Sequence, residues 1–419
     1  MSATTRSPGP EDLTTEPHSS AKPRGAALAF ILVTIALDML ALGMIIPVLP
    51  KLVERFVAGD TARAAAIFGL FGTVWAVMQF FFSPVLGTLS DRFGRRPVIL
   101  LSNLGLGLDY VLMALAPTLA WLFVGRVISG ITAASIATAH AYVADVMPPE
   151  RRARSYGLLG AAFGIGFILG PAIGGVLGAI GPRLPFWVAA AFSLANAAYG
   201  LFVLPESLPL ARRSSFSWRR ANPLGALVLL RSHPELSGLA AANFLAYLAH
   251  VIFPTVYVLY AGYRFGWDER AVGLTLAAFG LASMIVQAGL VGPVVSRIGE
   301  RRALLIGFLF NTAGMAIFAL APNGLTFCLG IPVISLSGFA QPASQGLMTR
   351  RVSPSEQGQL QGANAGIMGI ANLVGPTIFS VAFAYAIDLG RDRSGLPFWL
   401  AAVMLLGALV LAWRATRAR

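Results

Sequence analysis

Long apolar runs, separated by short polar segments, are the strongest constraint on the fold of this 419-residue chain. A helix needs about 20 apolar residues to cross ~30 Å of hydrocarbon, and the runs have about that length without the alternation of a barrel strand. They lie near 26–48, 65–87, 97–116, 119–141, 155–178, 184–204, 236–260, 271–293, 302–321, 325–349, 359–385 and 396–413. With 56% apolar and only 12% charged residues, the chain has too little polar surface for a soluble protein. We therefore expect an all-α membrane protein with twelve transmembrane helices.

The sequence also contains an internal repeat. Gly87, Arg92, Gly94 and Arg96 recur 205 residues later as Gly292, Arg297, Gly299 and Arg301. Parallel repeats of this kind are typical of secondary transporters. We expect a disordered cytoplasmic N-terminal tail (1–24), an N-terminal six-helix half (25–204), a central cytoplasmic linker (205–235) and a C-terminal six-helix half (236–419). The two halves should be pseudo-symmetric.

The net charge of +13 is explained by membrane topology rather than by nucleic-acid binding. If the N-terminus is cytoplasmic, 22 of the 31 Lys and Arg residues fall on the cytoplasmic side, 8 fall on the opposite side, and Arg126 lies within a helix. This asymmetry follows the positive-inside rule and predicts that both termini are cytoplasmic. The lipid bilayer is the expected partner.

Ionisable residues inside the apolar runs are candidates for proton transfer. Asp38 and Asp109 lie deep in such runs, as do His140 and His250. A charge at the membrane centre costs at least ~2.5–3.5 kcal/mol, so such residues are commonly functional. A carboxylate in an apolar setting can take up and release a proton near neutral pH. The alternative is a hydrogen-bonded packing role, which we favour for the two His residues but not for the two Asp residues.

Polar amides also interrupt the apolar runs, at Gln79, Gln287 and Asn311. Each can bind a solute or can form an interhelical hydrogen bond worth ~0.6 kcal/mol. No phosphate-binding loop of the GxxxxGK type and no Cys/His cluster with metal-ligand spacing occurs in the sequence. An ion gradient is therefore the expected energy source, with no cofactor and no metal site.

The run 155–178 has a pattern of small residues that predicts a close helix contact. Glycines at 166, 170, 174 and 178 are spaced by four and lie on one face of a helix, where another backbone can approach. Pro171 removes one backbone hydrogen bond and permits a bend.

Two motifs resemble the major facilitator superfamily. Residues 87–96 match its loop signature G-x-L-x-D-R-x-G-R-R, and residues 157–175 match the antiporter signature G-x8-G-x3-G-P-x2-G-G. The second motif consists of Gly157, Gly166, Gly170, Pro171, Gly174 and Gly175. Shorter stretches, among them 36–39, 78–80, 108–110 and 205–207, resemble the tetracycline/proton antiporters of Gram-negative bacteria.

The resemblance implies roles for particular residues. It implies a cytoplasmic latch, in which Asp91 and the loop arginines, notably Arg95, are linked by charge to Asp145 when the cavity faces outward. The loop residues of this latch are Gly87, Asp91, Arg92, Gly94, Arg95 and Arg96. Gly87 would allow the close helix contact that the latch needs. Asp38, Gln79, Asp109 and Gln287 match positions implicated in drug or cation handling, and Arg126 matches the arginine of the fourth helix.

At two positions the chain departs from this family. The tetracycline antiporters have a His and an Asp where this chain has Ser283 and Asn311. Neither Ser nor Asn titrates usefully, so we expect proton exchange to fall on Asp38 and Asp109, with His250 as a substitute in the second half.

The sequence thus predicts a proton-coupled efflux antiporter of the bacterial inner membrane, and not an enzyme. It would be a monomer that exports an amphipathic, tetracycline-like drug by alternating access, and the resemblance adds that the drug can arrive as a Mg²⁺ chelate. One alternative is a proton-linked transporter of a small metabolite. Another, from a different class, is a non-transporting membrane receptor or scaffold.

Overall fold

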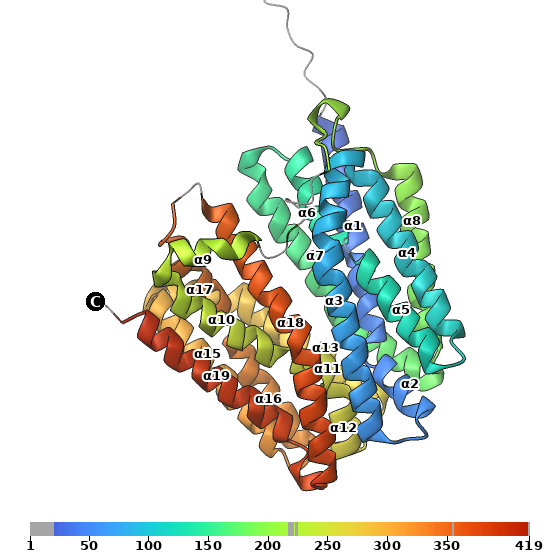
Figure 1. Ribbon diagram of the computed structural model, residues 1–419, viewed down its shortest axis with the longest axis vertical. Helices are drawn as coiled ribbons and strands as arrows, with labels where there is room; N and C mark the ends of the chain where they lie inside the picture. Colours follow the sequence, from blue (N-terminus) through green and yellow to red (C-terminus); the bar gives the residue numbers. More distant parts are fainter. Residues whose placement is uncertain (1–20, 134, 217–221, 223–224, 354–355, 418–419) are drawn as a thin grey trace, which may run out of the picture.

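The computed structural model describes residues 21–133, 135–216, 222, 225–353 and 356–417, and its regular elements are all helical (Figure 1). The N-terminal half contains α1 (Ala21–Ile45), α2 (Leu49–Phe56), α3 (Thr61–Phe93), α4 (Arg95–Leu115), α5 (Leu119–Thr132), α6 (Ser135–Val146), α7 (Pro149–Ile180) and α8 (Leu184–Val203). The expected tail, 1–24, lies mostly outside the described residues.

The described part of the linker contains short helices, and the second half follows it. The linker elements are η1 (Leu210–Arg212), η2 (Gly225–Val228), α9 (Leu229–Ser232) and η3 (Pro234–Leu236). The C-terminal half contains α10 (Ser237–His250), α11 (Ile252–Thr255), α12 (Tyr257–Phe265), α13 (Glu269–Ile285), η4 (Val286–Leu290), α14 (Val291–Ile298), α15 (Glu300–Leu320), α16 (Gly324–Ser335), η5 (Leu336–Phe339), α17 (Ala340–Thr349), α18 (Gln357–Asp388), η7 (Arg391–Arg393) and α19 (Leu396–Ala415).

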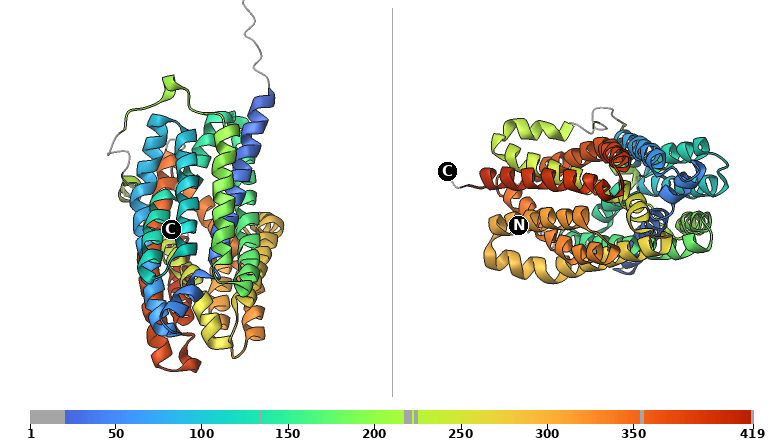
Figure 2. Two further views of the ribbon diagram at one scale, coloured as in Figure 1. Left: turned by 90° about the vertical axis from the view of Figure 1, so that its right-hand side faces the viewer. Right: turned by 90° about the horizontal axis from the view of Figure 1, so that it is seen from below.

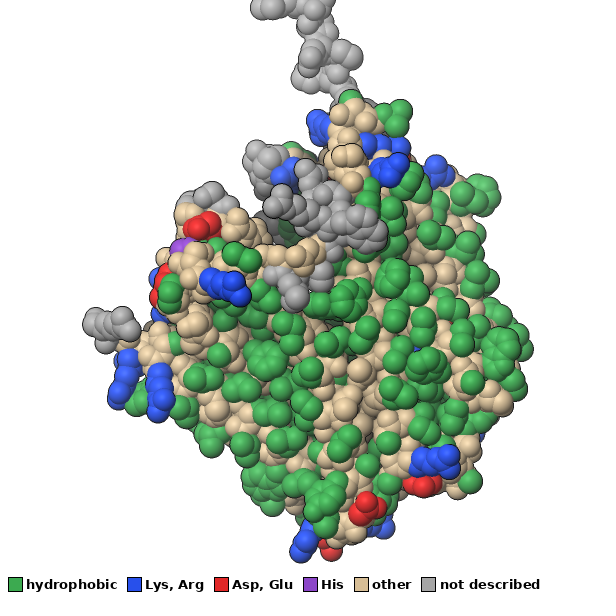
Figure 3. All heavy atoms as spheres, viewed as in Figure 1, with side chains coloured by type: hydrophobic (Ala, Val, Ile, Leu, Met, Phe, Trp, Pro, Cys, Tyr) green, Lys and Arg blue, Asp and Glu red, His purple; other side chains and the backbone are tan. Residues whose placement is uncertain are grey.

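The described helices form a membrane-spanning bundle. Eleven spans are long and apolar enough to cross a bilayer, and Leu119–Thr132 is a shorter apolar helix. Apolar side chains cover the visible flank of the bundle, whereas charged side chains gather at its two ends (Figure 3). We call the end that carries the linker the linker end and the opposite one the far end. Figure 2 shows the helices running side by side between these ends.

Several expected spans are interrupted rather than continuous. The span 119–141 is divided between α5 and α6, and the span 236–260 is divided among α10, α11 and α12. The second break has a clear cause, because Pro254 in α11 has no amide hydrogen to donate to the carbonyl of His250. A π-helical turn at η4 lies within the eighth span shortly before Pro293, and this span continues as one helix from Glu269 to Ile298. The expectation of single helices is therefore corrected for the fourth and seventh spans.

The glycine face of α7 packs against α1. A Cβ atom built on Gly166 would lie 2.7 Å from the Cβ of Met39, and one on Gly170 would lie 2.7 Å from the Cα of Gly43. One on Gly174 would collide with the Met44 backbone. Only glycine allows such an approach, because no side chain separates the two backbones. In contrast, a Cβ on Gly157 would meet no described atom within 4 Å, so this residue of the motif lies outside the contact.

The two halves contact each other through α7 with α13 and through α3 with α18. Gly175 of α7 faces Gly273 of α13, where an added Cβ would lie 3.0 Å from the opposing Cα. Thr73 and Thr377 join α3 to α18 by a hydrogen bond of 2.9 Å between their hydroxyls. In Figure 1 the halves converge toward α2 and α12 and diverge toward the linker end.

An ion pair also joins the halves at the far end. A guanidinium nitrogen of Arg55, in α2, lies 3.1 Å from the carboxylate of Glu269, at the start of α13. The Glu269 side chain is 10% exposed and that of Arg55 is 53% exposed, so water screens one side of the pair.

The linker is attached to the C-terminal half through His233. Its Nδ1 lies 2.8 Å from the Glu235 carboxylate and its Nε2 lies 3.1 Å from the Glu356 carboxylate. These two hydrogen bonds, that of Glu235 first, raise the pKa of His233 above its ordinary value. Hydrogen bonds from Ser353 and then from His233 lower the pKa of Glu356 to about 2.

The glycine face leads to a test of packing. Gly170→Val should lower the free energy of unfolding by about 1–3 kcal/mol, because the new side chain must displace the α1 backbone. Gly164→Val is the matched control, since a Cβ at Gly164 in the same helix would meet no described atom within 4 Å. Thermal unfolding of the purified variants measures the difference. Equal losses in the two variants would contradict close packing at Gly170.

The His233 bridge predicts a pH dependence. A raised His pKa contributes stability that is complete below the ordinary imidazole pKa and is lost as the pH rises through the folded-state value. The lowered pKa of Glu356 contributes stability above the ordinary carboxyl pKa, which is lost as the pH falls toward about 2. His233→Gln should therefore lower the thermal midpoint at mildly acidic pH but not at alkaline pH. A difference that is independent of pH would contradict this assignment, and His140→Gln serves as the control.

Candidate functional site

A cavity of about 320 Å³ lies between the two halves. Its wall is mostly apolar, and Arg126 is the charged residue among those that line it. The lining residues are Leu42, Ile45, Ile46, Leu49, Phe68, Gly72, Trp75, Ala76, Arg126 and Phe167 from the N-terminal half, and Val251, Pro254, Thr255, Asn372 and Pro376 from the C-terminal half. Such a wall suits a solute with a large apolar surface.

Arg126 pairs with Asp109 behind this wall. Its guanidinium lies 3.7 Å from the Asp109 carboxylate, and it also lies 3.4 Å from the sulfur of Met113. The Asp109 side chain is fully buried, whereas that of Arg126 is 11% exposed. Gly125 gives the carboxylate room, because a Cβ there would lie 2.6 Å from an Asp109 oxygen. A buried carboxylate with one cationic partner is a site where a single proton changes the local charge.

Asp38 accepts a hydrogen bond from a neutral amide. Nδ2 of Asn196, in α8, donates a hydrogen bond of 3.1 Å to the Asp38 carboxylate, and Thr34 in turn donates to the Asn196 carbonyl oxygen. Asp38 is 3% exposed. Sequence analysis missed Asn196, although an isolated Asn in the run 184–204 was an available signal. Neither Asp38 nor Gln79 is among the lining residues of the cavity between the halves.

A second cavity of about 320 Å³ lies within the C-terminal half. It brings together four residues singled out from the sequence, namely His250, Ser283, Gln287 and Asn311. Nδ1 of His250 lies 2.7 Å from the carbonyl oxygen of Ala246, which can only accept, so Nδ1 carries the hydrogen. Nε2 then accepts from the Asn311 amide at 3.4 Å. The imidazole is neutral in this arrangement.

The second cavity is also lined by Asn243 and Gln341, which the sequence analysis missed. The hydroxyl of Ser344, which is not itself a lining residue, donates a hydrogen bond of 2.8 Å to the Asn243 carbonyl, and the amide of Gln341 lies 3.5 Å from the hydroxyl of Tyr247, another lining residue. No carboxylate belongs to the lining of this cavity. No group of three or more metal-ligating His, Cys, Asp or Glu side chains gathers within the described part of the chain.

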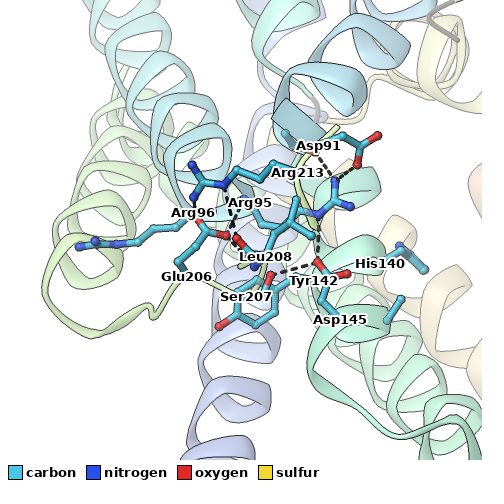
Figure 4. Close-up of polar contacts among 12 residues, drawn as sticks. Asp91, Arg95, Arg96, His140, Tyr142, Asp145, Glu206, Ser207, Leu208 and Arg213 are labelled. Atoms are coloured by element: carbon cyan, nitrogen blue, oxygen red, sulfur yellow. Dashed lines mark hydrogen bonds and ion pairs between the residues drawn. The ribbon is translucent and has the colours of Figure 1, made fainter. Parts of the chain in front are cut away.

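The predicted latch residues meet at the linker end of the N-terminal half (Figure 4). The Arg95 guanidinium lies 2.6 Å from the Asp91 carboxylate and 3.1 Å from that of Asp145. The Ser207 hydroxyl donates to the same Asp145 carboxylate at 3.2 Å. These contacts join α3, α4, α6 and the linker. They all lie within the N-terminal half and the linker.

The other latch residues have separate contacts. Arg96 donates a hydrogen bond of 2.6 Å to the Leu201 carbonyl, and Arg92 lies over the ring of Phe93 at 5.0 Å. Gly94 has φ of +108°, a conformation that favours glycine and allows the sharp turn between α3 and α4. A Cβ on Gly87 would meet no described atom within 4 Å, so the close helix contact expected there is not formed in this structure.

Glu206 is a latch neighbour that the sequence analysis did not identify. Its carboxylate accepts hydrogen bonds from the backbone amides of Arg95, at 2.9 Å, and Arg96, at 3.3 Å, and lies 3.8 Å from the Arg213 guanidinium (Figure 4). It thereby caps the start of α4, where backbone amides have no partner within the helix. In the sequence, Glu206 stood out only as part of the stretch 205–207, which resembles the tetracycline/proton antiporters.

The fold and the paired cavities define a multi-pass membrane transporter built from two related helical halves. The chain belongs to the Major Facilitator Superfamily, whose family model matches residues 31–376 and 239–419. This confirms the resemblance and the fold expected from the sequence, and it places the chain among transporters rather than enzymes.

Individual relatives agree with the family assignment. The class C tetracycline resistance protein of Escherichia coli is 38% identical over 85% of this chain and 90% of its own length. The class B protein of Escherichia coli is 35% identical over 90% of this chain and 91% of its own length. Among solved structures, that of the nucleoside transporter NupG has a TM-score of 0.76 at 13% identity and covers 94% of this chain and 100% of its own, which supports the fold alone.

The cap at Glu206 can be tested directly. Glu206→Gln should weaken the start of α4 by about 1 kcal/mol, the usual contribution of a helix cap. Hydrogen exchange of the Arg95 and Arg96 backbone amides should become faster by the factor that corresponds to this loss of about 1 kcal/mol. Glu54→Gln at the far end is the control and should leave these two amides unchanged. Unchanged exchange in Glu206→Gln would contradict the capping role.

Proposed function

We propose that this protein is a proton-coupled efflux antiporter that exports an amphipathic drug, with tetracycline-like compounds as the leading substrate. The observation that carries the proposal is the Asp109–Arg126 pair behind the wall of an apolar cavity between the halves. Homology to tetracycline resistance proteins over most of the chain supports it. A solute held in that cavity is adjacent to a carboxylate that can exchange one proton.

In this proposal the protein lies in the bacterial inner membrane with both termini and the linker in the cytoplasm. The two halves rock about the central cavity, as in alternating access. Contacts between the halves at the far end, such as Arg55 with Glu269, close the periplasmic side. The latch formed by Asp91, Arg95 and Asp145 lies within the N-terminal half, so it would brace the linker end of that half during the motion instead of joining the two halves.

A second candidate function is proton-linked transport of a small polar metabolite. The neutral cavity of the C-terminal half favours it, because Asn311 and Ser283 stand where the tetracycline antiporters have titratable residues. Amides and hydroxyls that line a cavity suit a solute with several hydrogen-bonding groups. Neither cavity presents a carboxylate among its lining residues, so a Mg²⁺ chelate would be held there without direct contact with an acid.

Proton movement provides the test of antiport. Inside-out vesicles that hold the protein should release protons when tetracycline or another drug of a panel is added. Asp109→Asn should abolish this release and the coupled export, because the amide cannot exchange a proton. Its abundance should be unchanged, because Arg126 faces the cavity and can be hydrated there. Retained coupled export in Asp109→Asn would overturn the role of Asp109, and silence toward every drug would favour the metabolite transporter.

A further inference from the structure

Asp109 and Arg126 differ in what they present to a bound solute. The Asp109 side chain is fully buried and is not among the residues that line the cavity, whereas Arg126 is. Of the pair, Arg126 in α5 thus reaches the cavity wall, whereas Asp109 in α4 does not. A solute in this cavity contacts the pair only through Arg126.

The charge of the pair depends on one proton. With Asp109 ionised, the carboxylate and the guanidinium cancel and the pair is neutral. With Asp109 protonated, the guanidinium keeps its charge, because arginine stays protonated in proteins. Proton uptake by a buried acid thus turns a neutral wall into a cationic one.

Few other charges oppose this change. Tyr110, on α4, lies within electrostatic reach of Asp109, Arg126 and Asp38, so Asp38 on α1 is the other acidic group in this region. It is bound by the Asn196 amide and does not line the cavity. From α3 the cavity receives apolar side chains such as Trp75. From the C-terminal half it receives the neutral residues Val251, Pro254, Thr255, Asn372 and Pro376.

We propose that Arg126 is the specificity-determining residue of the site. Through the charge of Arg126, the protonation state of Asp109 determines whether the cavity binds a cation or an anion. A cation binds the neutral form of the pair and is repelled by the protonated form, so it exchanges with the proton. An amphipathic anion binds the protonated form and is bound together with the proton. This inference rests on the proposed function, because it assumes that the cavity between the halves is the transport site.

Coupling between the substrate and the proton is then a consequence of thermodynamic linkage. If a proton weakens the binding of a cation, the cation must weaken the binding of the proton by the same factor. Antiport then follows for cations without a direct contact between substrate and acid. In an apolar cavity, a unit charge several Å away changes binding by roughly tenfold or more, even at an effective dielectric constant near 20.

Two ions of matched shape and opposite charge test the proposal. Tetraphenylphosphonium and tetraphenylborate are dialysed against the full-length protein in detergent between pH 5 and pH 8, with empty micelles as the blank. We expect the phosphonium to bind roughly tenfold more weakly at the acidic end and the borate to bind roughly tenfold more tightly there. Equal pH dependence for both ions, or no binding of either ion, would overturn the proposal.

Variants test which groups produce the charge preference and the pH dependence of ion binding. Asp109→Asn should bind both ions independently of pH and should prefer the borate, because Arg126 stays unpaired. Arg126→Gln should lose the preference for the borate at acidic pH, because protonation of Asp109 then leaves the site neutral instead of cationic, whereas Arg126→Lys should retain that preference. Arg63→Gln makes the same charge change at an exposed residue and should leave both curves unchanged. A wild-type preference retained in Arg126→Gln would overturn the role of Arg126.

This experiment and the vesicle experiment fail in different ways. Opposite pH dependences for the two ions, together with no drug-dependent proton movement in vesicles, would uphold the charge rule and overturn the proposed drug efflux. Drug-dependent proton movement together with parallel curves for the two ions would uphold efflux and overturn the charge rule.

Discussion

The side-chain-free face of α7 sets the spacing on which the rest of the bundle depends. Helices in a bilayer gain little from the hydrophobic effect when they associate, so close backbone contact supplies much of the attraction. Gly166, Gly170 and Gly174 bring α1 against α7, and Gly175 brings α13 of the other half against the same helix. One helix thus fixes both the interior of its own half and the position of the second half.

Buried charge is accommodated in two different ways within the N-terminal half. Asp109 has a charged partner, Arg126, whose guanidinium lies 3.7 Å from its carboxylate and reaches the cavity wall. Asp38 has an amide partner, Asn196, which stabilises the carboxylate by a hydrogen bond without balancing its charge. A proton on Asp109 therefore changes the charge that faces the cavity, whereas a proton on Asp38 changes a hydrogen-bonded cluster away from that wall.

The sequence was sufficient for the fold because its strongest signals are local. Apolar run length predicts spanning helices, and glycine spacing predicts the face of α7 that touches α1. The sequence predicted Asp109 and Arg126 singly but not as partners, because the rotations of α4 and α5 depend on packing. For the same reason it placed Gln79 among the candidate binding residues, whereas the cavity between the halves is lined by its neighbours Trp75 and Ala76.

Contacts between residues that lie far apart in the chain also could not be predicted from the sequence. Glu206 binds amides more than 100 residues earlier, and His233 binds Glu356 across the second half. Neither partner can be chosen from residue type alone, because many Glu and Arg residues lie in the polar loops. The break at Pro254 could have been read from the sequence, but the length of the apolar run outweighed it.

The contacts that join the halves differ in strength from those within the N-terminal half. Across the interface, Arg55 and Glu269 form a pair open to water on one side, and such pairs contribute only about 0–1 kcal/mol. The hydroxyls of Thr73 and Thr377 add one hydrogen bond, worth about 1 kcal/mol. The glycine contacts between α7 and α13 contain no side chains that must repack. Polar side chains therefore add little to the attraction between the halves at the far end, and the proposed rocking motion must instead loosen the close backbone contact between α7 and α13.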